Sequence, residues 1–138
     1  YDNLQVIVNV ISTPDCSINN GNTIVVNFGQ NVMTTRVDGT NYLQNIDYTL
    51  TCTNYFTNAM RMQISGTASS FNSQALNTDK TNLAIAIKSN NGTYSVNNWI
   101  NFDYPNKPVL SAVPIKRPGY DLTGGPFNAT ATMTIEYR

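Results

Sequence analysis

The residues that could do chemistry are few in this 138-residue chain, and they are spread along it. There is no histidine, which removes the commonest general base and the usual protein metal ligand. The seven aspartates and the single glutamate, Glu136, stand one at a time rather than in pairs. No glycine-rich phosphate loop follows a strand pattern and opens a helix. The sequence therefore predicts a protein that is not an enzyme and that uses no metal and no cofactor.

Cysteine is the other reactive side chain, and the chain has two, Cys16 and Cys52. An even number in a chain poor in charge and rich in strand formers indicates one disulfide, made in an oxidising compartment. Such a bridge closes a loop of roughly 37 residues and contributes about 4 kcal/mol on the chain-entropy account. The alternative is two buried free thiols.

Composition narrows the class of protein further. Charged residues make up 12% of the chain, with eight Lys and Arg against eight Asp and Glu. This balance gives no electrostatic reason to bind nucleic acid or an anionic membrane. No run approaches the ~18 apolar residues of a membrane span. The length fits a single domain, residues 1–138, with room for a real core.

The elements that hold these residues are predicted to be strands. Thr favours strands and Asn favours turns, whereas the best helix formers are scarce and no segment has a helical period. Short apolar patterns between turn signals predict seven or eight strands, which is typical of an antiparallel β-sandwich. The third is expected to run from Ile46 to Cys52, and 67–82 is expected to be a loop. The strand over 109–115 is placed near an edge because of its prolines. The expected strands begin near Leu4, Ile24, Ile46, Met60, Leu83, Thr93, Val109 and Phe127, and the stretch from Trp99 to Phe102 follows the one that begins at Thr93.

The last expected strand, 127–138, has the clearest pattern. Apolar and polar residues alternate along it, which gives a strand one dry face and one wet face. A strand of this length at the end of a chain needs partners on both sides. Its free side is covered either by a strand of the same chain or by one from another chain, through β-augmentation.

These features together resemble a chaperone–usher pilin. The resemblance rests on Cys16 after the first strand, Cys52 at the end of the third, Gly125 fourteen residues from the end and Tyr137 at the penultimate position. It covers essentially the whole chain. Within the family, the stretches 2–4, 18–21 and 24–29 are most similar to minor tip-fibrillum subunits of P-type pili.

The resemblance implies an immunoglobulin-like sandwich that lacks its C-terminal G strand and has one disulfide. A periplasmic chaperone then fills the resulting groove with a strand and holds the terminal carboxylate, here that of Arg138. At the outer-membrane usher, the N-terminal extension of the next subunit replaces that strand in a pilus outside a Gram-negative cell. The terminal strand would line one side of the groove with Phe127, Ala129, Ala131, Met133, Ile135 and Tyr137. The facing edge is expected to carry Val6, Val8 and Val10.

One departure from the family leaves alternatives open. Pilins other than the tip adhesin carry an extension before the first strand, but only fifteen residues precede Cys16 here. We expect the extension to lie outside this sequence; otherwise the subunit has no donor function. A second hypothesis is a single-domain tip adhesin that binds a host glycan or protein through its loops. Tyr94, Trp99 and Tyr104 offer a sugar-stacking platform, but aromatics of the core or of the sheet surface are the favoured interpretation. A third is a sandwich that pairs its terminal strand with a strand of its own.

Overall fold

The structure is a computed structural model that describes residues 4–12, 15–22, 24–28, 34–90, 92–124 and 127–138. The described chain is built of β-strands and two short 3-10 turns, η1 (Asn19–Gly21) and η2 (Thr34–Arg36), so the predicted all-β class is confirmed. Asparagine has the turn role that the composition indicated, because it tolerates the left-handed backbone conformation better than most residues. The asparagines with positive φ are Asn19, Asn20, Asn54, Asn82, Asn90 and Asn97.

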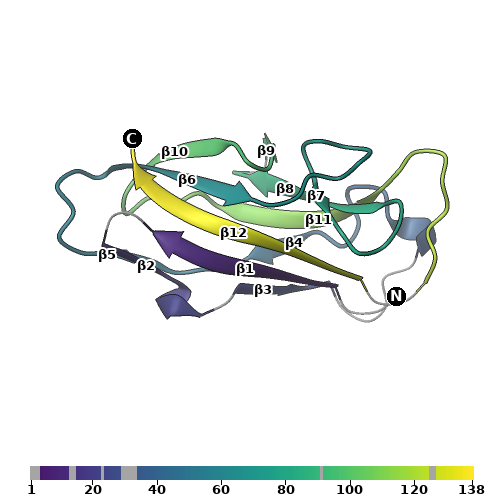
Figure 1. The fold of residues 1–138 in the computed structure, drawn as a ribbon, viewed down its shortest axis with the longest axis horizontal. Helices are drawn as coiled ribbons and strands as arrows, with labels where there is room; N and C mark the ends of the chain where they lie inside the picture. The colour runs from purple at the N-terminus through teal and green to yellow at the C-terminus, as the bar shows by residue number, and fades with distance from the viewer. Residues whose placement is uncertain (1–3, 13–14, 23, 29–33, 91, 125–126) are drawn as a thin grey trace.

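Two five-stranded sheets form the layers of the sandwich (Figure 1). The first sheet has, in spatial order, β10 (Trp99–Asp103), β6 (Ala59–Ser65), β12 (Phe127–Tyr137), β1 (Leu4–Ser12) and β3 (Ile24–Asn27). The second has β4 (Gln44–Ile46), β11 (Leu110–Lys116), β8 (Leu83–Ser89) and β7 (Leu76–Asn77), with β9 (Gly92–Tyr94) also paired to β8. A short ribbon joins β2 (Cys16–Ile18) to β5 (Leu50–Cys52).

The core lies between the two sheets and is supplied by alternate residues of each strand. On β6 the inward side chains of Met60, Met62 and Ile64 are buried, and the residues between them are half-buried. Strand β8 is apolar over its first residues and buried on both faces there, as its continuous run predicted. These side chains belong to one contiguous apolar cluster that also takes in the inward face of β12.

The predicted third strand is in fact two strands that belong to different sheets. Its segment 47–49 leaves the strand conformation between β4 and β5. The reason is Tyr48, which is 5% exposed and whose hydroxyl donates to the carbonyl of Pro108 at 2.6 Å. Because this buried hydroxyl needs a hydrogen-bond partner, the chain turns inward at Tyr48 and the pairing of β4 ends before it.

The edge position expected for β11 is also wrong, because β11 lies between β4 and β8. Proline is tolerated there because β4 pairs only with residues 110–112, so Pro114 lies beyond the end of β4. Within the predicted loop over 67–82, the structure adds the two-residue strand β7, which pairs with Ile85 and Ala84 of β8.

Candidate functional site: the two edges of strand β12

Strand β12 buries every second side chain, as its sequence pattern predicted. Met133 and Ile135 are 0% exposed, and the even-numbered residues between Asn128 and Glu136 are exposed or half-buried. Side chains at this spacing share one face of a strand, so the apolar row is continuous along the inner side of the sheet. Its members are Phe127, Ala129, Ala131, Met133 and Ile135, all buried, and Tyr137, half-buried.

One edge of β12 is paired antiparallel to β6, from Thr132 opposite Ser65 to Tyr137 opposite Met60. On the outer face of this pair, Arg61 Nη2 lies 2.7 Å from Glu136 Oε1. The same guanidinium lies 4.1 Å from the centre of the Trp99 ring, so one side chain links β6 to both of its neighbours. Side chains on both faces of the sheet therefore hold this edge.

The other edge of β12 is paired with β1, in parallel, over the whole length of β1. The register places Val6, Val8 and Val10 opposite Ala129, Ala131 and Met133. Among the described residues, β1 lies where the open groove between the first and last strands was expected, and β3 pairs with its far side (Figure 1). The terminal strand thus pairs with a strand of its own chain, as the third alternative expected. An apolar edge left without a partner is costly, and β1 is an alternating apolar segment within reach.

Beyond the end of β6, a side chain takes over the role of a neighbouring strand. Asp79 Oδ1 accepts a hydrogen bond from the Asn128 amide at 2.7 Å, and the Asp79 amide donates to the Asn128 carbonyl at 3.1 Å. The intervening Gly66 allows a close approach, because a Cβ there would lie 2.7 Å from Leu76 Cδ2 and 3.1 Å from the Thr130 carbonyl oxygen. No sequence pattern indicates this pairing, since 49 residues separate Asp79 from Asn128.

Arg138 holds the end of β12 against the ends of β6 and β10. Its guanidinium donates to the carbonyls of Met60 and Phe102, and its Nη2 lies 2.8 Å from Asp103 Oδ1. Beside it, the ring of Phe56 lies 4.2 Å from that of Tyr137 and is 81% exposed. The Arg138 side chain thus makes its interactions within the chain. The other family-motif residue, Gly125, lies outside the described residues.

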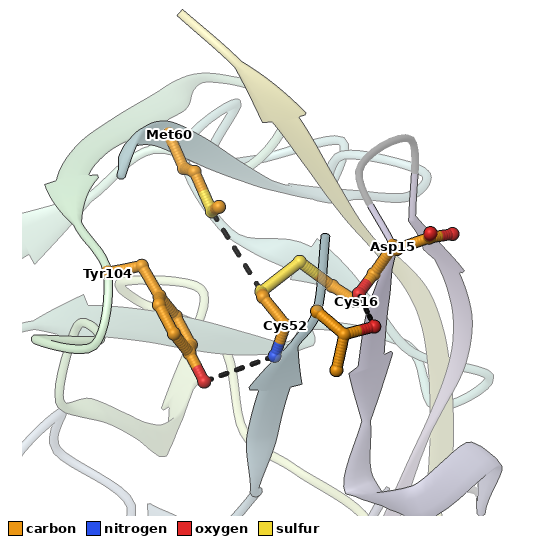
Figure 2. Close-up of a disulfide and its surroundings, with 6 residues drawn as sticks. Asp15, Cys16, Cys52, Met60 and Tyr104 are labelled. Atoms are coloured by element: carbon orange, nitrogen blue, oxygen red, sulfur yellow. Dashed lines mark hydrogen bonds between the residues drawn. A yellow bond between two sulfur atoms is a disulfide. The ribbon is translucent and has the colours of Figure 1, made fainter. Parts of the chain in front are cut away.

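The disulfide fixes the chain just after β1 (Figure 2). Cys16 and Cys52 are bonded, so the alternative of two free thiols is wrong. Around the bridge, the Cys52 amide donates to the Tyr104 hydroxyl at 3.1 Å and the Thr53 amide donates to the Asp15 carbonyl at 2.8 Å. From Asp15 onward the chain is therefore bound to β5, three residues after β1 ends.

The three aromatic residues considered for a sugar-stacking platform instead pack within the sandwich, as the favoured alternative of core or sheet-surface aromatics expected. Tyr94 is buried, and its hydroxyl donates to the Asn98 carbonyl at 2.5 Å and accepts from the Ile64 amide at 3.0 Å. Burial raises the pKa of Tyr94, so its hydroxyl stays a donor at neutral pH. Trp99 packs against Arg61, and Tyr104 lies edge-on to Tyr55. Each of these three side chains thus contacts another part of the same chain.

Neither a metal cluster nor a membrane-spanning helix is found among the described residues. No three His, Cys, Asp or Glu side chains gather there as a possible metal site. In the same part of the chain, no helix is long and apolar enough to cross a membrane.

Comparison with known proteins gives a consistent set of relatives. The sequence profile of the family described as fimbrial protein matches residues 4–138. The fimbrial-like protein YfcR of Escherichia coli K12 is 41% identical over 98% of this chain and 79% of its own length. The fimbrial-like protein YfcQ of the same strain is 30% identical over 94% of this chain and 83% of its own length.

Two solved pilus subunits share the fold. The P pilus adaptor subunit PapF is 24% identical with a TM-score of 0.65, over 91% of this chain and 97% of PapF. The P pilus rod subunit PapA is 19% identical with a TM-score of 0.72, over 90% of this chain and 99% of PapA. At these identities the likeness concerns the fold, and it agrees with the sandwich predicted from the sequence.

Proposed function

The chain belongs to the fimbrial protein family, and we propose that it is joined to its pilus neighbours by exchange of the β-strand beside β12. Membership of the family makes the chain a structural subunit of a pilus rather than an enzyme, and the partners of such a subunit are other pilus subunits. What is proposed here is the means of attachment and the residues that provide it.

The observation that carries the proposal is the pairing of β1 with β12. It is the one parallel pair among the strand pairs of the described residues, and parallel pairing is slightly less stable per residue than antiparallel pairing. Strand β1 also precedes the disulfide, so it can leave while the chain from Asp15 onward stays bound to β5. In the isolated chain, we take β1 to occupy the position beside β12 that a donor strand from another subunit would fill.

This assignment changes the expected roles of the first strand. The groove that accepts a donor strand still has β12 as one wall. The residues that line this wall are Phe127, Ala129, Ala131, Met133, Ile135 and Tyr137. With β1 withdrawn, β3 supplies the facing edge, so Val6, Val8 and Val10 belong to the strand that fills the place. Residues 4–12 then serve as the donor extension that was expected to lie outside the sequence.

The free energy that a buried donor strand contributes supports strand exchange as a means of assembly. A donor that buries four or five apolar side chains at ~1.5–3 kcal/mol each contributes on the order of 6–15 kcal/mol before entropy costs. An entire domain is stable by about 5–15 kcal/mol. A subunit with this place empty is therefore expected to be unstable, and one with a well-fitted donor to be very stable. The small Ala129 and Ala131 leave room for bulky donor side chains.

The proposal includes the route to the pilus that the family resemblance implies. A periplasmic chaperone lends the first donor strand and binds the carboxylate of Arg138, and the donor of the next subunit replaces it at the outer-membrane usher. The internal bonds of the Arg138 guanidinium support this role, because they leave the carboxylate rather than the side chain for a partner.

A refolding experiment tests the proposal. The full chain is unfolded and refolded with an excess of a peptide of sequence LQVIVNVIS, which copies residues 4–12, and the melting temperature of the isolated complex is measured. Because the peptide is free to bind antiparallel, we expect a rise of about 10 °C or more. The control peptide has Asp in place of the residues that copy Val6 and Val8. Failure of the parent peptide to bind, or equal binding of the control, would overturn the proposal.

A further inference from the structure

A cavity of about 350 Å³ opens where β4 leaves β11. The two strands pair only over 44–46 and 110–112, and the following segment 47–49 separates from 107–109. The backbone of Val109 is bound on its other side, since its amide donates to Asn90 Oδ1 at 3.1 Å and its carbonyl accepts from the Asn90 amide at 2.7 Å. The volume falls within the usual range for small-molecule sites, ~300–1,000 Å³.

The floor of the cavity is apolar and held in place. Ile46, Tyr48 and Leu110 are all 5% exposed or less, and the Tyr48 hydroxyl is bonded to the Pro108 carbonyl. Burial raises the pKa of Tyr48, so this hydroxyl remains a donor and keeps the two walls joined at physiological pH. At the rim, the Val109 side chain is 64% exposed.

Polar groups of both signs stand around this floor. The Lys107 ammonium donates to the Tyr48 carbonyl and lies 4.4 Å from the centre of the Tyr48 ring. One of its three N–H groups is therefore used and two remain for a ligand. Asp47 and Asn45 also line the cavity; both are exposed, and neither makes a side-chain hydrogen bond or ion pair with the described residues. The site offers donors and acceptors but no net charge.

We propose that this cavity binds a neutral pyranose sugar. The C–H groups of a pyranose suit the apolar floor, and its hydroxyls can accept from Lys107 and donate to Asp47. A phosphate or carboxylate ligand fits less well, because its attraction to Lys107 is offset by repulsion from the Asp47 carboxylate. A site open on one side and sized for a single sugar ring should bind at about millimolar Kd. The inference does not depend on strand exchange.

The test is a titration of the full chain, labelled with nitrogen-15, with methyl pyranosides of glucose, galactose, mannose and N-acetylglucosamine to about 50 mM. At least one of these sugars should shift the amide signals of Asn45–Thr49 and Lys107–Leu110. Glucuronic acid is the anionic comparison. Saturable shifts confined to these segments support the inference. No shift there with any of the four sugars, or shifts with glucuronic acid alone, would overturn it.

Two variants locate the site. Lys107→Met keeps the stem over Tyr48 but removes the ammonium, and Asp47→Asn removes the carboxylate charge; each should weaken binding tenfold or more. Lys116→Met and Asp121→Asn are matched controls outside the cavity and should bind as the parent does. If Lys107→Met fails to fold, Asp47→Asn decides alone, since Asp47 is exposed and its side chain bonds to no described residue. Unchanged affinity in Asp47→Asn would contradict the assignment.

Discussion

The two edges of β12 are paired over different lengths, 132–137 toward β6 and 127–135 toward β1, and are held in different ways. Toward β6, the pairing is antiparallel and is reinforced by the buried Met60, Met62 and Ile64 and by the outer Arg61–Glu136 ion pair. Toward β1, the pairing is parallel and comes from a segment that lies before the disulfide. The same strand thus has one edge built into the body of the subunit and one edge covered by the segment that we propose to be exchangeable.

In the proposed strand exchange, this difference lets a pilus subunit be both folded and reactive. The β6 edge shares its side chains with the second sheet through the core, so it cannot open without unfolding the body. In the proposed exchange the β1 edge opens locally, because Asp15 is the first described residue after β1 and its carbonyl is bonded to the Thr53 amide. Reactivity at one edge therefore leaves the other intact.

The largest expected effect comes from breaking both edges at once with Ile135→Lys. Ile135 is 0% exposed and lies opposite Met62 on one side and Ser12 on the other. An unpaired charge at this position should cost roughly 5 kcal/mol or more and abolish folding and donor binding. Thr134→Lys, on the outer face of the same strand, is the control and should change stability by about 0.5 kcal/mol or less. A normal melting temperature for Ile135→Lys would contradict the assigned face.

Loss of the disulfide is the next largest expected effect. The bridge joins residues 36 apart, so removing it with Cys16→Ala and Cys52→Ala together should cost about 4 kcal/mol in denaturant unfolding. It should also move the boundary between the detachable segment and the body, which limited proteolysis would detect as new cleavage after Asp15. Unchanged stability, with cleavage still confined before Asp15, would show that the hydrogen bonds to β5 fix this boundary alone.

The smallest expected effect is on the outer face of the β6 edge. Arg61→Ala removes the ion pair to Glu136 and the contact with Trp99, both partly exposed, and should cost about 0.5–1.5 kcal/mol. Thermal unfolding with and without added salt measures it, and the Glu136→Gln variant separates the ion pair from the ring contact. A loss above about 3 kcal/mol would mean that the outer face holds this edge more than the core does.

The sequence predicted the parts of this arrangement that depend on local pattern. Period-two alternation identified β12 and its buried face, and the cysteine count predicted the bond between Cys16 and Cys52. Local pattern does not determine which strands pair, because pairing depends on contacts between distant segments. For this reason the parallel pairing of β1 with β12, and the split of 46–52 between two sheets, were missed.

The sequence also could not predict which side chains bind backbone groups in place of a neighbouring strand. Asp79 binds the backbone of Asn128, and Tyr104 binds the amide of Cys52, across 49 and 52 residues. Single polar residues in loops carry no periodic signal, and their roles follow only from the geometry of the finished sandwich. The cavity beside Lys107 likewise results from the end of β4, which the expected single strand from Ile46 to Cys52 concealed.

Native-state hydrogen exchange of the full chain tests the difference between the two edges most directly. The amides of β1 should exchange through a local opening, at a free energy below that of global unfolding and with little dependence on denaturant. Those of β6 and β8 should exchange only with global unfolding. If the amides of β1 are as strongly protected as those of β6 and share their denaturant dependence, β1 is a permanent part of the sheet and the account of an exchangeable edge is wrong.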